Sequence, residues 1–172
     1  MNAEWKASLI HTLNHANSLA APPRFRHLDS GHGSIPVGPI ERVVESADRL
    51  ELHELPGRYG DAIDDRAWDR LDDIFTPDGV FDLTAVGGAR HEGLAAIKEF
   101  MDGAHHPLAH LMVNIYVDES ASGDVQLHFR ILAPLDGGSM GTAAYCDDVV
   151  RTTAGWRVVN RVVTPRGAVM LG

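Results

Sequence analysis

The spacing of apolar residues changes once along this sequence, after His105-His106-Pro107, and this change restricts the fold more than any other feature. Before this point apolar residues recur at every third or fourth position, which is the spacing of amphipathic helices. After it, apolar and polar residues alternate, as in half-buried strands. The alternation predicts four long strands, over residues 108–118, 125–135, 140–152 and 156–164. Helices followed by an antiparallel meander predict an α+β fold with the helices packed on one face of the sheet.

The part before this change contains one long predicted helix and shorter elements. An apolar stripe from Ile40 to Leu55 predicts a helix that continues to about Asp64. Because proline lacks a backbone donor and crowds the preceding turn, we expect a kink or a restart at Pro56-Gly57. A second helix near 68–75, a strand at 80–85 and a helix near 94–102 follow.

The chain divides into an N-terminal appendage, residues 1–40, and one domain, residues 41–172. Residues 3–20 have the periodicity of a short amphipathic helix, and residues 21–39 are a linker rich in proline, glycine and serine.

The charge balance argues against several classes of partner. The 172 residues include 24 acidic and 15 basic ones, for a net charge of −9, and no basic face is clustered. We therefore expect no nucleic acid, whose phosphates require such a face. We also expect no membrane association, because no apolar run approaches the roughly 18 residues of a membrane span. A single cysteine, Cys146, and the lack of a secretory signal favour the cytoplasm.

The two faces of the predicted sheet differ in polarity. Alternation along the first long strand places four side chains on one face: His110, Met112, Asn114 and Tyr116. One face would line a pocket under the helices, and the other needs a second covering surface, most simply another subunit. We therefore expect a homo-oligomer, either a dimer or a trimer.

Histidine is the side chain best suited to moving protons near neutral pH, and the chain has 10 histidines. His110 differs from the others because it opens an apolar strand, and the pattern leaves open both a catalytic base and a hydrogen-bonded core histidine. The aspartates from Asp61 to Asp73 are spaced like a solvated helix face, so spacing singles out none of them. His106 and His110 lie four residues apart, as in a zinc-binding helix, but Pro107 interrupts such a helix. We expect neither a metal nor a cofactor.

The segment ADRLELHELPGRYGDAIDDRAWDRLDDIFTPDGVFDL at 47–83 is followed in order by GLAAIKEF, AHLMVNIYV and GWRVVNRVV. This series resembles the SnoaL-like members of the NTF2-like superfamily over about residues 42–166. The resemblance implies an NTF2-like cone, in which three helices cover the concave face of a strongly curved antiparallel sheet. It also implies an apolar pocket that takes a small hydrophobic molecule.

Site residues are implied by the same resemblance. Dehydratases and a dehydrochlorinase of this type pair an aspartate with a histidine, at positions that match Asp64 and His110. A catalytic tyrosine matches Tyr59, and a substrate-binding arginine matches Arg161. We expect further substrate-binding residues at Trp68, Met112, Asn114 and Tyr145. The polar groups that hold water in scytalone-type enzymes are replaced here, which argues against a scytalone substrate.

The chemistry implied is general-base catalysis. An aspartate that accepts from one imidazole nitrogen fixes the tautomer and leaves the other nitrogen as a base. The resemblance therefore implies a cofactor-independent lyase of the dehydratase kind, or an isomerase, acting on a steroid-, terpenoid- or polyketide-like molecule. The alternative is a non-catalytic ligand-binding or assembly subunit, like the small subunit of ring-hydroxylating dioxygenases. A separation of Asp64 and His110 beyond hydrogen-bond reach would favour that alternative.

Overall fold

The computed structural model describes residues 44–135 and 137–170. The helix and linker predicted for residues 1–40 lie outside the described residues. The helices are α2 (Ser46–Asp64), η2 (Trp68–Asp73), η3 (Thr84–Val86) and α3 (Leu94–Gly103), where η denotes a 3-10 helix. The strands are β1 (Phe75–Asp82), β2 (Arg90–Glu92), β3 (Leu111–Glu119), β4 (Val125–Pro134), β5 (Ser139–Thr152) and β6 (Gly155–Met170). No helix in these ranges is long and apolar enough to cross a membrane.

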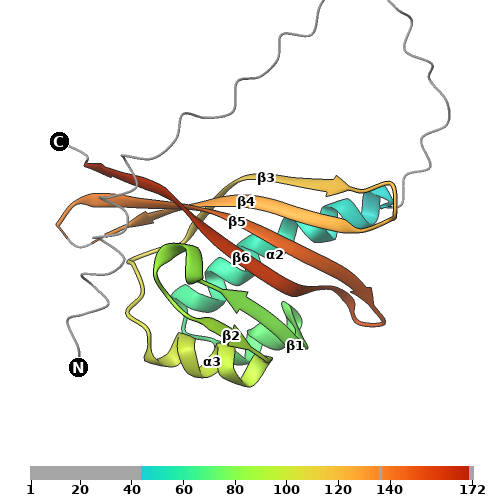
Figure 1. The fold of residues 1–172 in the computed structure, drawn as a ribbon, viewed down its shortest axis with the longest axis horizontal. Coiled ribbons are helices and arrows are strands. Elements are labelled where there is room, and N and C mark those ends of the chain that lie inside the picture. The colour runs from blue at the N-terminus through green and yellow to red at the C-terminus, as the bar shows by residue number, and fades with distance from the viewer. Residues whose placement is uncertain (1–43, 136, 171–172) are drawn as a thin grey trace, which may run out of the picture.

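The strands form one curved, open sheet in the order β2-β1-β6-β5-β4-β3. The last four strands pair antiparallel in chain order, as their alternation predicts, whereas β1 pairs parallel with β6. Figure 1 shows the long strands twisting across α2, with α3 beside β1 and β2. The predicted α+β fold is therefore confirmed. The strand expected at 80–85 begins earlier, at Phe75, because its first residue already pairs with Val158 of β6.

Helix α2 packs its apolar side across the inner face of the sheet. Leu55, Tyr59 and Ile63 on this side are at most 2 % exposed, and they share one core with Leu127 and Phe129 of β4. Burying one such side chain contributes about 1.5–3 kcal/mol. This layer fixes the C-terminal end of α2 relative to the sheet.

Of the kink or restart predicted at Pro56-Gly57, the restart is wrong, because α2 runs without interruption from Ser46 to Asp64. Proline removes one intrahelical hydrogen bond, but Pro56 itself is buried with the apolar side of the helix. The helix is also joined to the sheet in its N-terminal part, where Glu51 accepts a hydrogen bond from the backbone N–H of Trp156 at 2.9 Å. Tertiary packing therefore outweighs the local preference to break.

Strand β3 contains a bulge that the sequence alternation did not predict. Asn114 has a φ of 54°, and the pairing register shifts between Val113 and Tyr116. Asparagine adopts this left-handed conformation more readily than most residues, and the bulge moves every later side chain to the opposite face. The prediction that Tyr116 shares a face with His110 is therefore wrong: Tyr116 is 52 % exposed and stacks on His128, whose side chain points away from the core.

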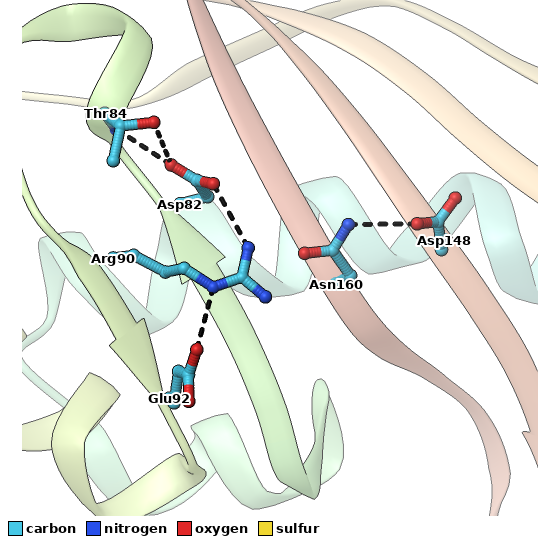
Figure 2. Close-up of polar contacts among 6 residues, drawn as sticks. All are labelled: Asp82, Thr84, Arg90, Glu92, Asp148 and Asn160. Atoms are coloured by element: carbon cyan, nitrogen blue, oxygen red, sulfur yellow. Dashed lines mark hydrogen bonds and ion pairs between the residues drawn. The ribbon is translucent and has the colours of Figure 1, made fainter.

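The outer face of the sheet is covered by no other described element. Leu111, Leu132 and Tyr116 on this face are 50 %, 38 % and 52 % exposed. Figure 2 shows polar pairs at other positions of this face, with Arg90 between Asp82 and Glu92, and Asn160 bonded to Asp148. The expected homo-oligomer, which would cover this face, stays a prediction.

Candidate active site

The end of α2 and the start of β3 meet at an aspartate–histidine contact. Asp64 is the last residue of α2, and His110 directly precedes β3. One carboxylate oxygen of Asp64 lies 2.6 Å from His110 Nδ1, and the other accepts the His110 backbone N–H at 2.9 Å. The carboxylate thus holds both the ring and the backbone of His110. The structure brings together the two residues that the family resemblance selected.

Gly60 permits this close approach of α2 and β3. A Cβ at this position would lie 3.0 Å from the backbone oxygen of His110 and 3.4 Å from the Cε of Met112. Any larger side chain would therefore push the start of β3 away from the helix. Met112 packs against the core at this junction, and it is not among the residues that line the cavity described next.

The contact with Asp64 sets the protonation pattern of the His110 ring. An ionised carboxylate only accepts hydrogen bonds, so Nδ1 carries the hydrogen and Nε2 is the nitrogen that can take a proton. The His110 side chain is 7 % exposed, whereas that of Asp64 is 30 % exposed. The pair is therefore buried at the histidine and partly open to solvent at the aspartate.

His110 lines a cavity of about 570 Å³ beneath the inner face of the sheet. This volume lies within the roughly 300–1,000 Å³ typical of small-molecule sites. Most of the wall is apolar, and its bulky members include Phe81, Leu83, Phe100, Met101, Ile131, Leu135 and Val163. Asp64 is not part of the wall, so its influence on a ligand passes through His110.

Two buried tyrosines contribute to the wall of the same cavity. Tyr59 and Tyr145 are 2 % and 8 % exposed, both line the cavity, and their ring centroids are 6.4 Å apart. Burial raises the pKa of Tyr59 to about 12, although the Arg161 cation opposes the rise. Burial also raises the pKa of Tyr145 well above its usual range. Both phenols therefore stay protonated at neutral pH and can donate to an oxygen atom of a ligand.

Residues 44–162 match the family model of the SnoaL-like domain. The chain belongs to this family. Proteins of Mycobacterium tuberculosis and Mycobacterium bovis, both described as uncharacterised, are 34 % identical over 134 residues, which covers 71 % of this chain and 88 % of each relative.

Two solved structures extend the comparison of this SnoaL-like domain. A Novosphingobium aromaticivorans protein, suggested to be an aromatic ring hydroxylase, is 27 % identical with a TM-score of 0.60, over 72 % of this chain and 92 % of that one. A type 2 hexachlorocyclohexane dehydrochlorinase is 17 % identical with a TM-score of 0.60, over 74 % and 94 % of the two chains. At this lower identity the dehydrochlorinase shows the shared fold alone.

Arg161 of this SnoaL-like domain lies beneath the cavity and not in its wall. Its side chain and that of Asp147 are both 0 % exposed, and two hydrogen bonds of 2.8 and 2.6 Å join them. The guanidinium lies 4.1 Å from the centroid of the Tyr59 ring and within 5.4 Å of three further aromatic rings. Burial disfavours the charged form, but the attraction of Asp147 outweighs it and raises the pKa of Arg161. Arg161 therefore reaches the cavity only through Tyr59 and Tyr145.

The remaining predicted wall residues lie outside the cavity. The Trp68 indole donates to Asp102 at 3.0 Å and packs against the His106 ring, with centroids 5.8 Å apart. Asn114 is exposed at the bulge of β3. Of the four further substrate-binding residues predicted, the structure places Tyr145 in the wall.

Two residues near the site carried no predicted role, Asp147 and His106. Asp147 had a usable signal, because alternation along β5 places it on the same face as Tyr145, where a carboxylate needs a cation. Its direct cross-strand partner on β6 is Arg161. His106 follows α3 in an irregular segment, and no periodicity there indicates where its ring points.

Proposed function

We propose that this protein is a cofactor-independent lyase or isomerase that uses His110 as a general base on a small, hydrophobic, oxygenated molecule. The observation that carries the proposal is the two-point contact of Asp64 with His110, on a ring that also lines the apolar cavity. Fixed orientation of a base beside a ligand is what proton abstraction requires. The SnoaL-like family and its fold neighbours are consistent with this chemistry.

In the proposed reaction, His110 Nε2 takes a proton from the carbon next to a substrate carbonyl. The electron pair of that C–H bond forms an enolate, and the Tyr59 hydroxyl donates a hydrogen bond to the developing oxyanion. If the β-carbon carries a hydroxyl group, the enolate expels this group, which takes the proton from His110 and leaves as water. If the β-carbon is instead part of a β,γ double bond, His110 returns the proton to the γ-carbon and the substrate is isomerised.

Both outcomes give a conjugated enone, so ultraviolet absorbance detects either. The test is turnover of hydrophobic cyclic β-hydroxy ketones and of β,γ-unsaturated ketones by the full chain. We expect His110→Ala and Asp64→Asn each to lower turnover by about 10²-fold or more, the usual worth of a positioned base. Asp65→Asn is the matched control, because the exposed Asp65 bonds Arg70 and does not contact His110. Full activity in both site variants would refute the assignment of the base.

A second candidate is a non-catalytic subunit of a ring hydroxylase, favoured by the description of the Novosphingobium protein. Such a subunit has no need for a poised base, and we expected Asp64 and His110 to lie apart in it. Their separation of 2.6 Å argues for the enzyme instead. Stable co-purification with a large Rieske-type subunit, without enone formation, would favour the second candidate.

A further inference from the structure

The cavity contains a second oriented imidazole besides His110. The rings of His106 and His110 both line it, with centroids 5.9 Å apart. The proposed chemistry uses His110 alone. The question is therefore which hydrogen-bonding atom His106 presents to a bound molecule.

The backbone of α3 determines the tautomer of His106. Its Nε2 lies 2.7 Å from the carbonyl oxygen of Met101. A carbonyl oxygen only accepts, so Nε2 carries the hydrogen and donates it. In the neutral ring, Nδ1 is then an acceptor. Because His106 lines the cavity, Nδ1 is the ring nitrogen that remains for a bound molecule.

Packing holds this ring in place and keeps it neutral. The Trp68 indole packs against it with centroids 5.8 Å apart, and Trp68 is itself fixed by its bond to Asp102. Burial lowers the pKa of His106, and this effect outweighs the opposing effect of its hydrogen bond to Met101. Smaller effects of the nearby His110 and Arg66 lower the pKa further. A neutral ring with its one hydrogen already donated can recognise only a donor.

We propose that His106 is a specificity-determining residue that accepts a hydrogen bond from a hydroxyl group of the substrate, beside the position from which His110 removes a proton. The assignment rests on the proposed function in placing both rings in one substrate site. The wall then offers donors at Tyr59 and Tyr145 and imidazole acceptors at His106 and His110. The matching ligands are hydroxylated, with a second oxygen that accepts from a tyrosine, and ethers of the same shape bind less well.

Binding of two matched probes tests this assignment without requiring turnover. The probes are 2-naphthol, which has a hydroxyl donor, and 2-methoxynaphthalene, which lacks one. We expect the full chain to bind the naphthol about threefold to tenfold more tightly by calorimetry, the usual worth of one neutral hydrogen bond. His106→Phe keeps an aromatic ring against Trp68 but has no acceptor. We expect this variant to bind the two probes about equally, with an affinity for the ether that changes less than twofold. In His106→Asn, whose amide oxygen can accept, part of the preference returns.

His110→Phe and Glu99→Met are the controls, because both native side chains line the same cavity and could accept the naphthol hydroxyl, whereas their replacements cannot accept it. The assignment requires the preference to survive in both. A preference retained in His106→Phe and lost in either control would overturn it. Nitrogen-15 spectra of the imidazoles give a test that needs no ligand: a hydrogen on Nδ1 of His106 at neutral pH would also overturn it.

The two proposals fail in different ways. Absence of enone formation, with the naphthol preference intact and dependent on His106, removes the lyase or isomerase and leaves a hydroxyl-binding site. Turnover that depends on His110, with no effect of His106→Phe on the probe preference, removes the role of His106 and leaves the enzyme.

Discussion

The buried Asp147–Arg161 pair makes a demanding prediction about stability. Both side chains are 0 % exposed and are joined by two short hydrogen bonds. Removing one partner of a buried pair costs about 3–5 kcal/mol, because the other charge stays buried without compensation. Replacing both partners with apolar residues of similar volume is often neutral or stabilising. The two single variants should therefore lose much more stability than the double variant does.

We expect Arg161→Met to lower the free energy of unfolding by about 3–5 kcal/mol at neutral pH, since it leaves the Asp147 carboxylate without its cation. Asp147→Asn should cost less, because the guanidinium keeps its contacts with four aromatic rings, the nearest with its centroid at 4.1 Å. The amide oxygen of asparagine can also still accept one hydrogen bond. The free energy of unfolding of the double variant Arg161→Met/Asp147→Leu should lie within about 2 kcal/mol of the wild-type value. Its loss of stability should therefore be much smaller than the sum of the losses in the two single variants.

Urea unfolding monitored by circular dichroism gives these free energies, and an unchanged denaturant slope confirms that the folded states are comparable. Burial raises the pKa of Asp147, and Arg161→Met removes the cation that opposes this rise. An acid whose folded pKa is raised loses stability as pH increases through that pKa. The penalty of Arg161→Met should therefore shrink as the pH is lowered and Asp147 takes up a proton. A penalty below about 1 kcal/mol, or additive single variants, would refute the reasoning.

Two further predictions concern Tyr59 and the outer face of the sheet. Burial raises the pKa of Tyr59 to about 12, against about 10 for tyrosine in the unfolded chain. As the pH increases, the unfolded state therefore loses this proton first, and the stability of the fold should decrease from pH 10 toward pH 12. Tyr59→Phe should reduce this slope in urea unfolding, and an unchanged slope would contradict the burial argument. For the outer face, we expect sedimentation to give the mass of a dimer or trimer for the full chain and a smaller mass for the variant Leu111→Asp/Leu132→Asp. The control is Leu50→Asp, which changes a leucine of α2 that is 65 % exposed. A monomeric wild type would exclude the assembly.

The successes of the sequence analysis concern features that repeat along the chain. The four long strands and their antiparallel order follow from alternation at period two, which depends only on which side chains face the core. The Asp64–His110 contact required the order of family motifs, because spacing alone made Asp64 one of several aspartates on a polar helix face. The failures at Pro56 and beyond Asn114 are local. Each depends on the balance between a backbone preference and the packing of one element on another.

The sequence by itself determined the α+β class and the order of the elements, and the order of its family motifs singled out Asp64 and His110. Only the tertiary structure decided what surrounds that pair. The register between β5 and β6 places Asp147 against Arg161, the bulge at Asn114 reverses the later part of β3, and the carbonyl of Met101 sets the hydrogen on His106. Each of these is a contact between atoms with defined directions, made by segments that pack together only in the folded chain. A linear pattern records which residues must be buried, but the hydrogen-bond partners are chosen by the geometry of the folded chain.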